Sequence, residues 1–280
     1  MEKIALVTDS TADLTPAMKT EYKAHVMPLK ILFGEQEYLD GELTSEEFYL
    51  RLASARELPR SSQPAPEDFI RLYREILTKY DEIISIHLST ALSGTVNAAR
   101  LAAESLQAKI HVVDSKNISL GIGLMVAEAA QGIMAGLESI QVLEQIQRAR
   151  RNIETMFTLN TLEYLQKGGR IGRVQGMVGS LLNIKPVIRV NDEGVYVPAG
   201  KARSQDKALE QIVKSLTELA GERKAKTLAI AHGAALEAAN RLKESLENAF
   251  DIPATIITQV GAVIGVHTGP GTVGAAVQFE

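Results

Sequence analysis

One stretch of the chain, residues 119–137, constrains the fold more than any other. After Ser119 it is apolar around most of the circumference of a helix, and Glu128 and Gln131 are its only polar side chains. These two residues and the glycines of the stretch argue against a membrane-spanning helix. Such a helix must be covered by protein on both sides, or by an apolar ligand on one of them. We therefore expect a buried helix over residues 119–136.

Strand and helix patterns alternate through the first half of the chain, which is typical of a mainly parallel sheet with helices on its faces. The strands expected there are 4–8, 25–33, 82–88 and 110–113, with helices at 16–22, 44–55, 66–80, 119–136 and 139–151 and another that starts at Ser93. In the second half, strands are expected at 154–159, 187–190, 195–198, 226–231, 254–259 and 274–279, with helices at 162–166, 204–219 and 234–248. This second pattern is typical of an α/β domain with a mixed sheet.

The length of the chain favours two domains, because 280 residues exceed the usual size of a single core. We expect an N-terminal α/β domain with a mainly parallel sheet at residues 1–155, and a C-terminal α/β domain with a mixed sheet at residues 156–280. Clefts between domains are common ligand sites. A ligand site is therefore expected at or near the interface.

The composition excludes several classes of function. The chain has no cysteine, which rules out disulfides, thiolate metal sites and thiol catalysis. Its formal net charge of −4 gives no general attraction to nucleic acid or to an anionic membrane. The histidines show no metal-ligand spacing, and no complete nucleotide-phosphate motif is present. The apolar run before Asp9 is too short for a signal peptide, so we expect a cytoplasmic protein without an integral membrane segment.

Residues 83–95 predict an anion site. A β-branched run ends there in hydroxyl-bearing residues and a glycine, and strong helix formers follow. This order places Ser93 at a helix start, where free backbone N–H groups and the helix dipole hold a carboxylate or phosphate without a lysine. An ordinary serine N-cap is the alternative interpretation.

Polar clusters also follow other expected strands and helices, at residues 8–13, 60–66, 167–173 and 265–272. In the first cluster Asp9 is a candidate to orient a ligand group, whereas Asp13 is expected to cap the next helix. In the second cluster the prolines hold Ser62 in an extended loop. The third cluster is basic and rich in glycine, which suits a phosphate or an acidic partner surface.

The fourth cluster surrounds His267 with three glycines and a proline, which predicts a tight turn beside backbone N–H groups. One functional hypothesis is therefore a hydrolase or acyl transferase with Ser93 as nucleophile, His267 as base and Asp9 as orienting acid. Ser93 lacks the glycine-flanked elbow of such nucleophiles, which argues against this hypothesis. A sugar- or nucleotide-binding regulator is a further hypothesis, and it rests on the α/β architecture alone.

The chain resembles the DegV family in five motifs that occur in the same order and span its whole length. They are Thr8-Asp9-Ser10-Thr11, Ser61-Ser62-Gln63-Pro64, Leu92-Ser93-Gly94-Thr95, Gly168-Gly169-Arg170-Ile171 and Val266-His267-Thr268-Gly269-Pro270-Gly271. The resemblance implies a two-domain fold like that of the dihydroxyacetone kinase catalytic half. It also implies a bound long-chain fatty acid, palmitate- or oleate-like, and a role as the fatty-acid-binding subunit of bacterial fatty acid kinase. In that system a separate ATP-dependent subunit phosphorylates the carboxylate, and the acyl phosphate feeds phospholipid synthesis.

The resemblance also implies which residues hold the carboxylate. They are Ser93 and a hydroxyl of either Ser61 or Ser62, with His267 nearby. Many relatives carry Thr-Ser-Gln-Pro where this chain has Ser-Ser-Gln-Pro, so the hydroxyl is kept at the first position. The choice between the two serines stays open at this point.

Two arginines complete the implied site. Arg170 and Arg203 match positions associated in the family with the carboxylate network or with docking of the kinase subunit. Asp9 and Thr95 are expected to provide polar support. The resemblance implies no catalytic residue, no metal and no cofactor in this chain, because the separate ATP-dependent subunit carries out the phosphoryl transfer.

Overall fold

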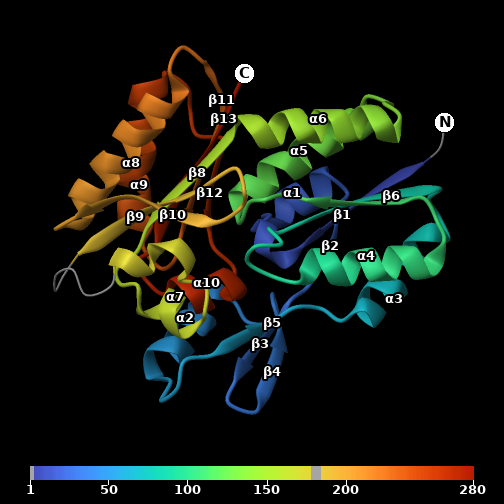
Figure 1. Cartoon of the computed structure of the whole chain (residues 1–280), viewed down its shortest axis with the longest axis horizontal. Helices are drawn as coiled ribbons and strands as arrows, with labels where there is room; N and C mark the ends of the chain where they lie inside the picture. The colour runs from blue at the N-terminus through green and yellow to red at the C-terminus, as the bar shows by residue number, and fades with distance from the viewer. Residues whose placement is uncertain (1–2, 178–183) are drawn as a thin grey trace.

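The computed structural model describes residues 3–177 and 184–280. Its first sheet has four strands in the order β2-β1-β6-β7, and every neighbouring pair is parallel. These strands are β1 (Ile4–Asp9), β2 (His25–Met27), β6 (Glu82–His87) and β7 (Ile110–Asp114). Figure 1 shows the sheet on the side of the molecule where the chain begins. The parallel sheet expected for the first half is confirmed.

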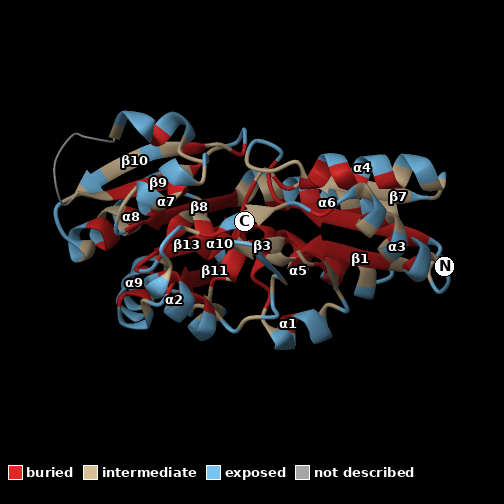
Figure 2. Ribbon diagram, turned by 90° about the horizontal axis from the view of Figure 1, so that it is seen from below, coloured by how far each residue is buried: buried red, intermediate tan, exposed pale blue. Residues whose placement is uncertain are grey.

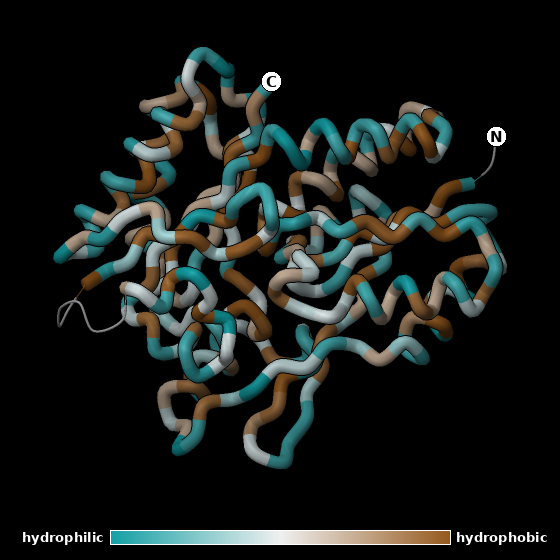
Figure 3. Tube along the Cα trace, in the orientation of Figure 1, coloured by the Kyte–Doolittle hydropathy of each residue, from teal (hydrophilic) through white to brown (hydrophobic). Residues whose placement is uncertain are grey.

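Helices cover both faces of this sheet, and the alternation of side chains along β1 explains the arrangement. Ala5 and Val7 pack on one face with α3 (Pro66–Leu77) and α4 (Thr95–Leu106). Leu6 points to the opposite face, where α5 (Leu120–Met134) and α6 (Ser139–Asn152) lie. In Figure 3 the strands are mostly brown, whereas the outer helices alternate between brown and teal, as amphipathic helices do.

The second sheet has six strands in the order β10-β9-β8-β13-β11-β12. They are β8 (Ile153–Thr158), β9 (Lys185–Val190), β10 (Tyr196–Ala202), β11 (Ala225–His232), β12 (Ile256–Gln259) and β13 (Val273–Phe279). Only β11 and β12 are parallel, so the expected mixed sheet is confirmed. One face of this sheet packs against α8 (Gln205–Ala220) and α9 (Leu236–Phe250).

The helix α5 lies between the two large sheets. It packs on β1 and β6 of the first sheet and on β8, β11 and β13 of the second. Its Glu128 accepts hydrogen bonds from Gln145 and Gln278 and pairs with Lys226, so the buried charge is compensated. Figure 2 shows the strands and the helix between them largely in red. The expectation of a buried helix is confirmed, and no helix of the described residues could cross a membrane.

A small third sheet lies beside the two large ones, at the bottom of Figure 1. In it β3 (Lys30–Phe33) pairs antiparallel with both β4 (Gln36–Leu39) and β5 (Arg60–Ser62). The sequence predicted a loop at residues 60–66, but its first three residues form an edge strand on β3. The remaining elements are α1 (Pro16–Glu21), α2 (Ser45–Ser54), α7 (Glu163–Lys167), α10 (Ala262–Thr268) and two short 3-10 helices, η1 (Ser10–Ala12) and η2 (Gly172–Met177).

Two helix starts differ from the sequence-based expectation. The helix α4 begins at Thr95 with Gly94 as its N-cap, so Ser93 lies one residue before the cap. Asp13 does not cap α1; the cap is Thr15, whose hydroxyl accepts the N–H of Met18. Asp13 instead adopts a left-handed conformation with φ of 51°, and its carboxylate is used by distant parts of the chain. The carboxylate of Asp13 therefore binds Ser119 and Gly261 in place of capping α1.

Candidate functional site

A polar pocket lies at the carboxyl edge of the parallel sheet, where open α/β sheets place their ligands. Loops that follow β1, β6 and β7 form part of its wall, and β5 and α10 close it. It contains about 790 Å³ of atom-free space, including its opening to solvent. Its lining residues are Thr11, Leu29, Ser61, Ser62, Gln63, Leu88, Leu92, Ser93, Ile118, Arg170, Tyr196, Val263, Ile264, His267 and Thr268. All five motifs, which are far apart in the sequence, therefore contribute residues to one pocket.

His267 and Ser61 form a pair in this pocket. The Nε2 atom of His267 lies 2.7 Å from the hydroxyl of Ser61, and Ser62 lines the same pocket. Burial, helped by the nearby charge of Arg170, lowers the pKa of His267 to about 4. The imidazole of His267 in this pocket is therefore neutral at pH 7.

The surroundings of His267 differ from the predicted tight turn. The residue lies in the last turn of α10, and Gly269, with φ of 69°, ends that helix. Its Nδ1 atom is buried beside Gly168 and makes no hydrogen bond with the described residues. A Cβ atom at Gly168 would lie 2.3 Å from Nδ1, so only glycine permits this close approach.

We expect Gly168→Ala to displace the imidazole of His267 and to lengthen its bond to Ser61. The added methyl group would overlap the ring, and such overpacking costs about 1 to 3 kcal/mol of unfolding free energy. Urea unfolding and the NMR shifts of the imidazole measure both effects. Gly176→Ala is the matched control, because a Cβ atom there meets nothing within 4 Å. Unchanged imidazole shifts in Gly168→Ala would refute the prediction.

Ser93 lies in the wall of the pocket on the turn that leads into α4. Its hydroxyl is 2.9 Å from that of Thr95 and accepts a long hydrogen bond, 3.4 Å, from the N–H of Thr95. The structure thus brings Ser93, Thr95 and the first turn of the helix together. Thr95 itself is buried behind Ser93 and does not line the pocket.

Arg170 is the single arginine or lysine among the described residues that line the polar pocket. Its Nε donates to the carbonyl of Leu92 at 3.2 Å and its Nη1 to the carbonyl of Gly168 at 2.8 Å. These bonds tie the glycine loop to the turn that carries Ser93. Arg203 is exposed at the end of β10 and is not part of this lining.

Asp9 is fully buried below the pocket and does not reach into it. Its carboxylate accepts the N–H groups of Thr11 and Leu88 at 3.0 Å and lies 3.0 Å from Nδ1 of His87. Since Thr11 and Leu88 both line the pocket, Asp9 holds the backbone of two lining residues in place. Its carboxylate is thus committed to His87 and not to His267, so no relay from Ser93 through His267 to Asp9 is assembled.

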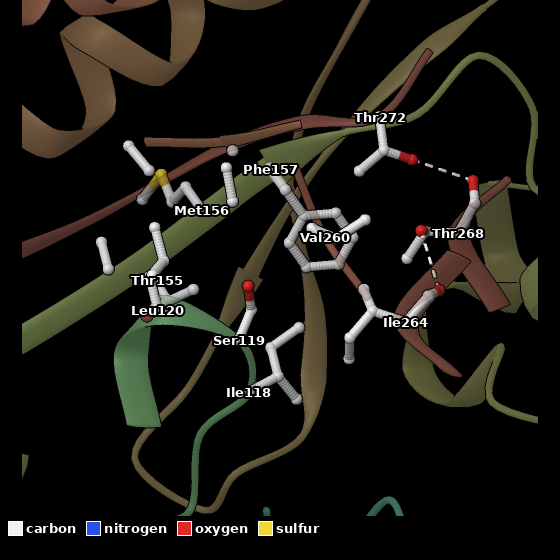
Figure 4. Close-up of a pocket in the computed structure, with 14 residues that line it drawn as sticks. Ile118, Ser119, Leu120, Thr155, Met156, Phe157, Val260, Ile264, Thr268 and Thr272 are labelled. Atoms are coloured by element: carbon white, nitrogen blue, oxygen red, sulfur yellow. Dashed lines mark hydrogen bonds between the residues drawn. The ribbon is translucent and has the colours of Figure 1, made fainter. Parts of the chain in front are cut away.

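An apolar cavity lies next to the polar pocket, and Figure 4 shows the side chains that line this cavity. It contains about 400 Å³ of atom-free space, including any opening to solvent, between the start of α5, the strands β8, β11 and β13, and the helix α10. Ile118, Ile264 and Thr268 line both spaces, so the two spaces are neighbours that share one wall. The hydroxyls of Thr268 and Thr272 donate to backbone carbonyls, so these residues present few free polar groups to the cavity.

Two aspartates, the buried Asp13 and the partly buried Asp40, hold the beginning of α10. Asp13 accepts the N–H of Gly261 at 2.7 Å and the hydroxyl of Ser119, and Asp40 accepts the N–H of Ala262 at 3.1 Å. Burial raises the pKa of Asp13 to about 7, and burial also raises the pKa of Asp40. The local sequence does not indicate that Asp13 holds α10, since the partners of Asp13 lie more than 100 residues away.

Metal binding finds no support in the described part of the chain. No group of three His, Cys, Asp or Glu side chains in residues 3–177 and 184–280 is placed to hold an ion. Two sheets around a buried helix, with a polar pocket beside an apolar cavity, define a two-sheet α/β protein with a concave site of mixed polarity.

The chain belongs to the DegV family, as the resemblance of its five motifs indicated. The matching family model, described as "Uncharacterised protein, DegV family", covers residues 3–280. A DegV domain-containing protein of Clostridium perfringens is 37% identical over 284 residues, and the match covers 100% of both chains.

Solved structures of the same family confirm the fold. One, described as showing fatty acid binding of a DegV family protein from Thermus thermophilus, is 37% identical with a TM-score of 0.93. Another, described as DegV, a fatty acid binding protein from Bacillus subtilis, is 32% identical with a TM-score of 0.90. Each match covers 100% of both chains.

Proposed function

We propose that this protein binds a long-chain fatty acid, with the carboxylate in the polar pocket and the acyl chain in the apolar cavity. The observation that carries this proposal is that the polar pocket and the apolar cavity lie side by side and share Ile118, Ile264 and Thr268. A polar space beside an apolar one fits a molecule with one charged end and a long apolar tail. The two solved relatives described as fatty acid binding support the same ligand class.

The energetics favour the same arrangement. Each buried methylene contributes about 0.8 kcal/mol, so the tail supplies most of the affinity and the polar end supplies the orientation. The hydroxyls of Ser61 and Ser93 are the donors for the carboxylate, and Ser61 is oriented by the neutral His267. The charge of Arg170 on the same wall stabilises the ionised head group.

The protein then presents this carboxylate to a separate ATP-dependent kinase subunit in the cytoplasm. A carboxylate oxygen attacks the γ-phosphorus of ATP, the bond from that phosphorus to the bridging oxygen breaks, and ADP leaves with the electron pair. The products are an acyl phosphate and ADP. In this proposal the chain is the carrier and the kinase subunit is the catalyst; the contact of Asp9 with His87, in place of His267, argues against the alternative Ser93–His267–Asp9 relay. Arg203, exposed directly after β10, is a candidate contact for the kinase subunit.

Ser93→Ala should weaken the binding of oleate by about 1 to 2 kcal/mol, which is roughly 5- to 30-fold in Kd. The physical reason is the loss of one hydrogen bond to a charged group. Isothermal titration of delipidated protein measures the effect. Ser105→Ala is the matched control, because this serine of α4 bonds only to the carbonyl of Ala102 and lines neither space. Equal affinities for the two variants would remove Ser93 from the site.

Oleate-loaded protein should form oleoyl phosphate only when ATP and the kinase subunit of a bacterial fatty acid kinase are both present. Hydroxylamine traps an acyl phosphate as a hydroxamate, which mass spectrometry detects. ATP alone should give no hydroxamate. Product formed with ATP alone would show that this chain is itself catalytic, and the absence of product with the kinase subunit would refute the presenting role.

A further inference from the structure

Tyr196, the first residue of β10, lines the polar pocket with a hydroxyl that has no assigned task. The residue is only 4% exposed. Its hydroxyl makes no hydrogen bond with the described residues. A tyrosine hydroxyl that leaves bulk water usually finds a partner, because it loses its hydrogen bonds to water. The unpaired hydroxyl of Tyr196 therefore points to a ligand group in the polar pocket.

The ring of Tyr196 is held firmly, which gives its hydroxyl a defined place. It packs edge-to-face on Phe157, with the ring centroids 5.3 Å apart and the planes at 74°. Both aromatic residues belong to one buried cluster with Ile118. The backbone of Tyr196 pairs with Val190 on the neighbouring strand β9. Since Phe157 and Ile118 also line the apolar cavity, the ring of Tyr196 stands close to the border between the cavity and the polar pocket.

The hydroxyl of Tyr196 lies near the positive charge of the polar pocket. Ser93, Arg170 and Tyr196 line this pocket together and also share the lining of an adjoining space, so they form one wall. Burial raises the pKa of the Tyr196 hydroxyl, and the charge of Arg170 lowers it by a smaller amount. The phenol therefore keeps its proton at pH 7 and is available as a donor. No Asp or Glu among residues 3–177 and 184–280 lines the polar pocket, so none repels an anion there.

We propose that the hydroxyl of Tyr196 donates a hydrogen bond to the carboxylate of the bound fatty acid. The proposal rests on the function proposed above and adds a third hydroxyl donor to those of Ser61 and Ser93. A carboxylate has two oxygens with about four lone-pair sites, which accommodate three hydroxyl donors. Each such bond favours the ionised form of the ligand, so Tyr196 also keeps the head group charged.

The variant Tyr196→Phe tests this role, because it removes the hydroxyl and keeps the ring that packs on Phe157. The probe is oleate labelled with ¹³C at the carboxyl carbon, added to delipidated protein. Isothermal titration at pH 7 gives the Kd, and ¹³C NMR at several pH values gives the pKa of the bound carboxyl group. Tyr164→Phe is the matched control, since Tyr164 is half-buried and lines neither the polar pocket nor the apolar cavity.

We expect Tyr196→Phe to raise the Kd for oleate roughly 5- to 30-fold and to raise the pKa of the bound carboxyl group by about 1. Tyr164→Phe should change neither value. The pKa of the ligand is the decisive measurement, because looser packing alone would weaken binding without a change in the ionisation of the carboxyl group. Thermal unfolding establishes that both variants are folded.

Two results would overturn the role of Tyr196 while fatty acid binding stands. Weaker binding with an unchanged carboxyl pKa would mean that Tyr196 only shapes the pocket. No change in either value would mean that its hydroxyl does not reach the carboxylate. If the unsubstituted protein binds no oleate, the proposed function itself fails, and the inference fails with it.

Discussion

Ala231→Leu should shorten the acyl chain that the protein accepts. Ala231 lies on β11, is 7% exposed and lines the apolar cavity. Leucine adds three carbon atoms to this wall, which displace about three methylenes of the ligand. At about 0.8 kcal/mol each, we expect palmitate to bind roughly 50-fold more weakly. Dodecanoate, which is four carbons shorter, should bind almost as before.

The comparison between palmitate and dodecanoate distinguishes a loss of space in the apolar cavity from a general loss of protein stability. Ala149→Leu is the matched control, because Ala149 is equally buried in α6 but lines neither the polar pocket nor the apolar cavity. This variant should lose stability and keep its preference for palmitate. An equal loss of affinity for both acids in Ala231→Leu would place the tail elsewhere.

Asp13→Asn should remove a large part of the pH dependence of stability. Burial raises the pKa of Asp13 from 3.8 to about 7, so the folded protein holds this proton more tightly than the unfolded chain does. The resulting stability is fully present below pH 3.8 and is lost as the pH rises through 7. It amounts to about 3 kcal/mol between pH 5 and pH 8. Asparagine keeps the acceptor for the N–H of Gly261 and removes the titration.

The free energy of unfolding in urea, measured at several pH values, tests this expectation. The wild-type protein should lose about 3 kcal/mol relative to Asp13→Asn between pH 5 and pH 8. The difference between the two proteins is needed because burial lowers the pKa of His267 to about 4, which acts in the opposite sense. Asp192→Asn, at a fully exposed carboxylate, is the control. Parallel curves for Asp13→Asn and wild type would refute the role assigned to the buried Asp13.

Hydrophobic patterns predicted the two large sheets and the buried helix because these elements bury long apolar runs. They did not predict β5, which is a short and mostly polar edge strand whose pairing with β3 sets its conformation. The helix α10 was missed for a different reason. Six of its seven residues are buried, so no polar face marks it, and the glycines around it resemble those of a turn. The division into domains 1–155 and 156–280 stays a prediction.

Local motifs identified several pocket residues because each lies on a loop at the end of a strand or helix. Ser61, Ser93, Arg170 and His267 line one pocket, as the resemblance implied that they would lie near one ligand. The sequence could not reveal the place of Tyr196, since an isolated aromatic residue on a strand carries no such signal. It also could not separate the roles of the two arginines, and the structure puts only Arg170 at the pocket.

A polar pocket beside an apolar cavity is expected to hold a long-chain fatty acid, and the lipid content of the protein tests this binding. The protein is purified, its lipids are extracted, and mass spectrometry quantifies them against the protein. We expect close to one long-chain fatty acid per chain. A protein that is empty after purification and that also takes up neither oleate nor palmitate would contradict the account.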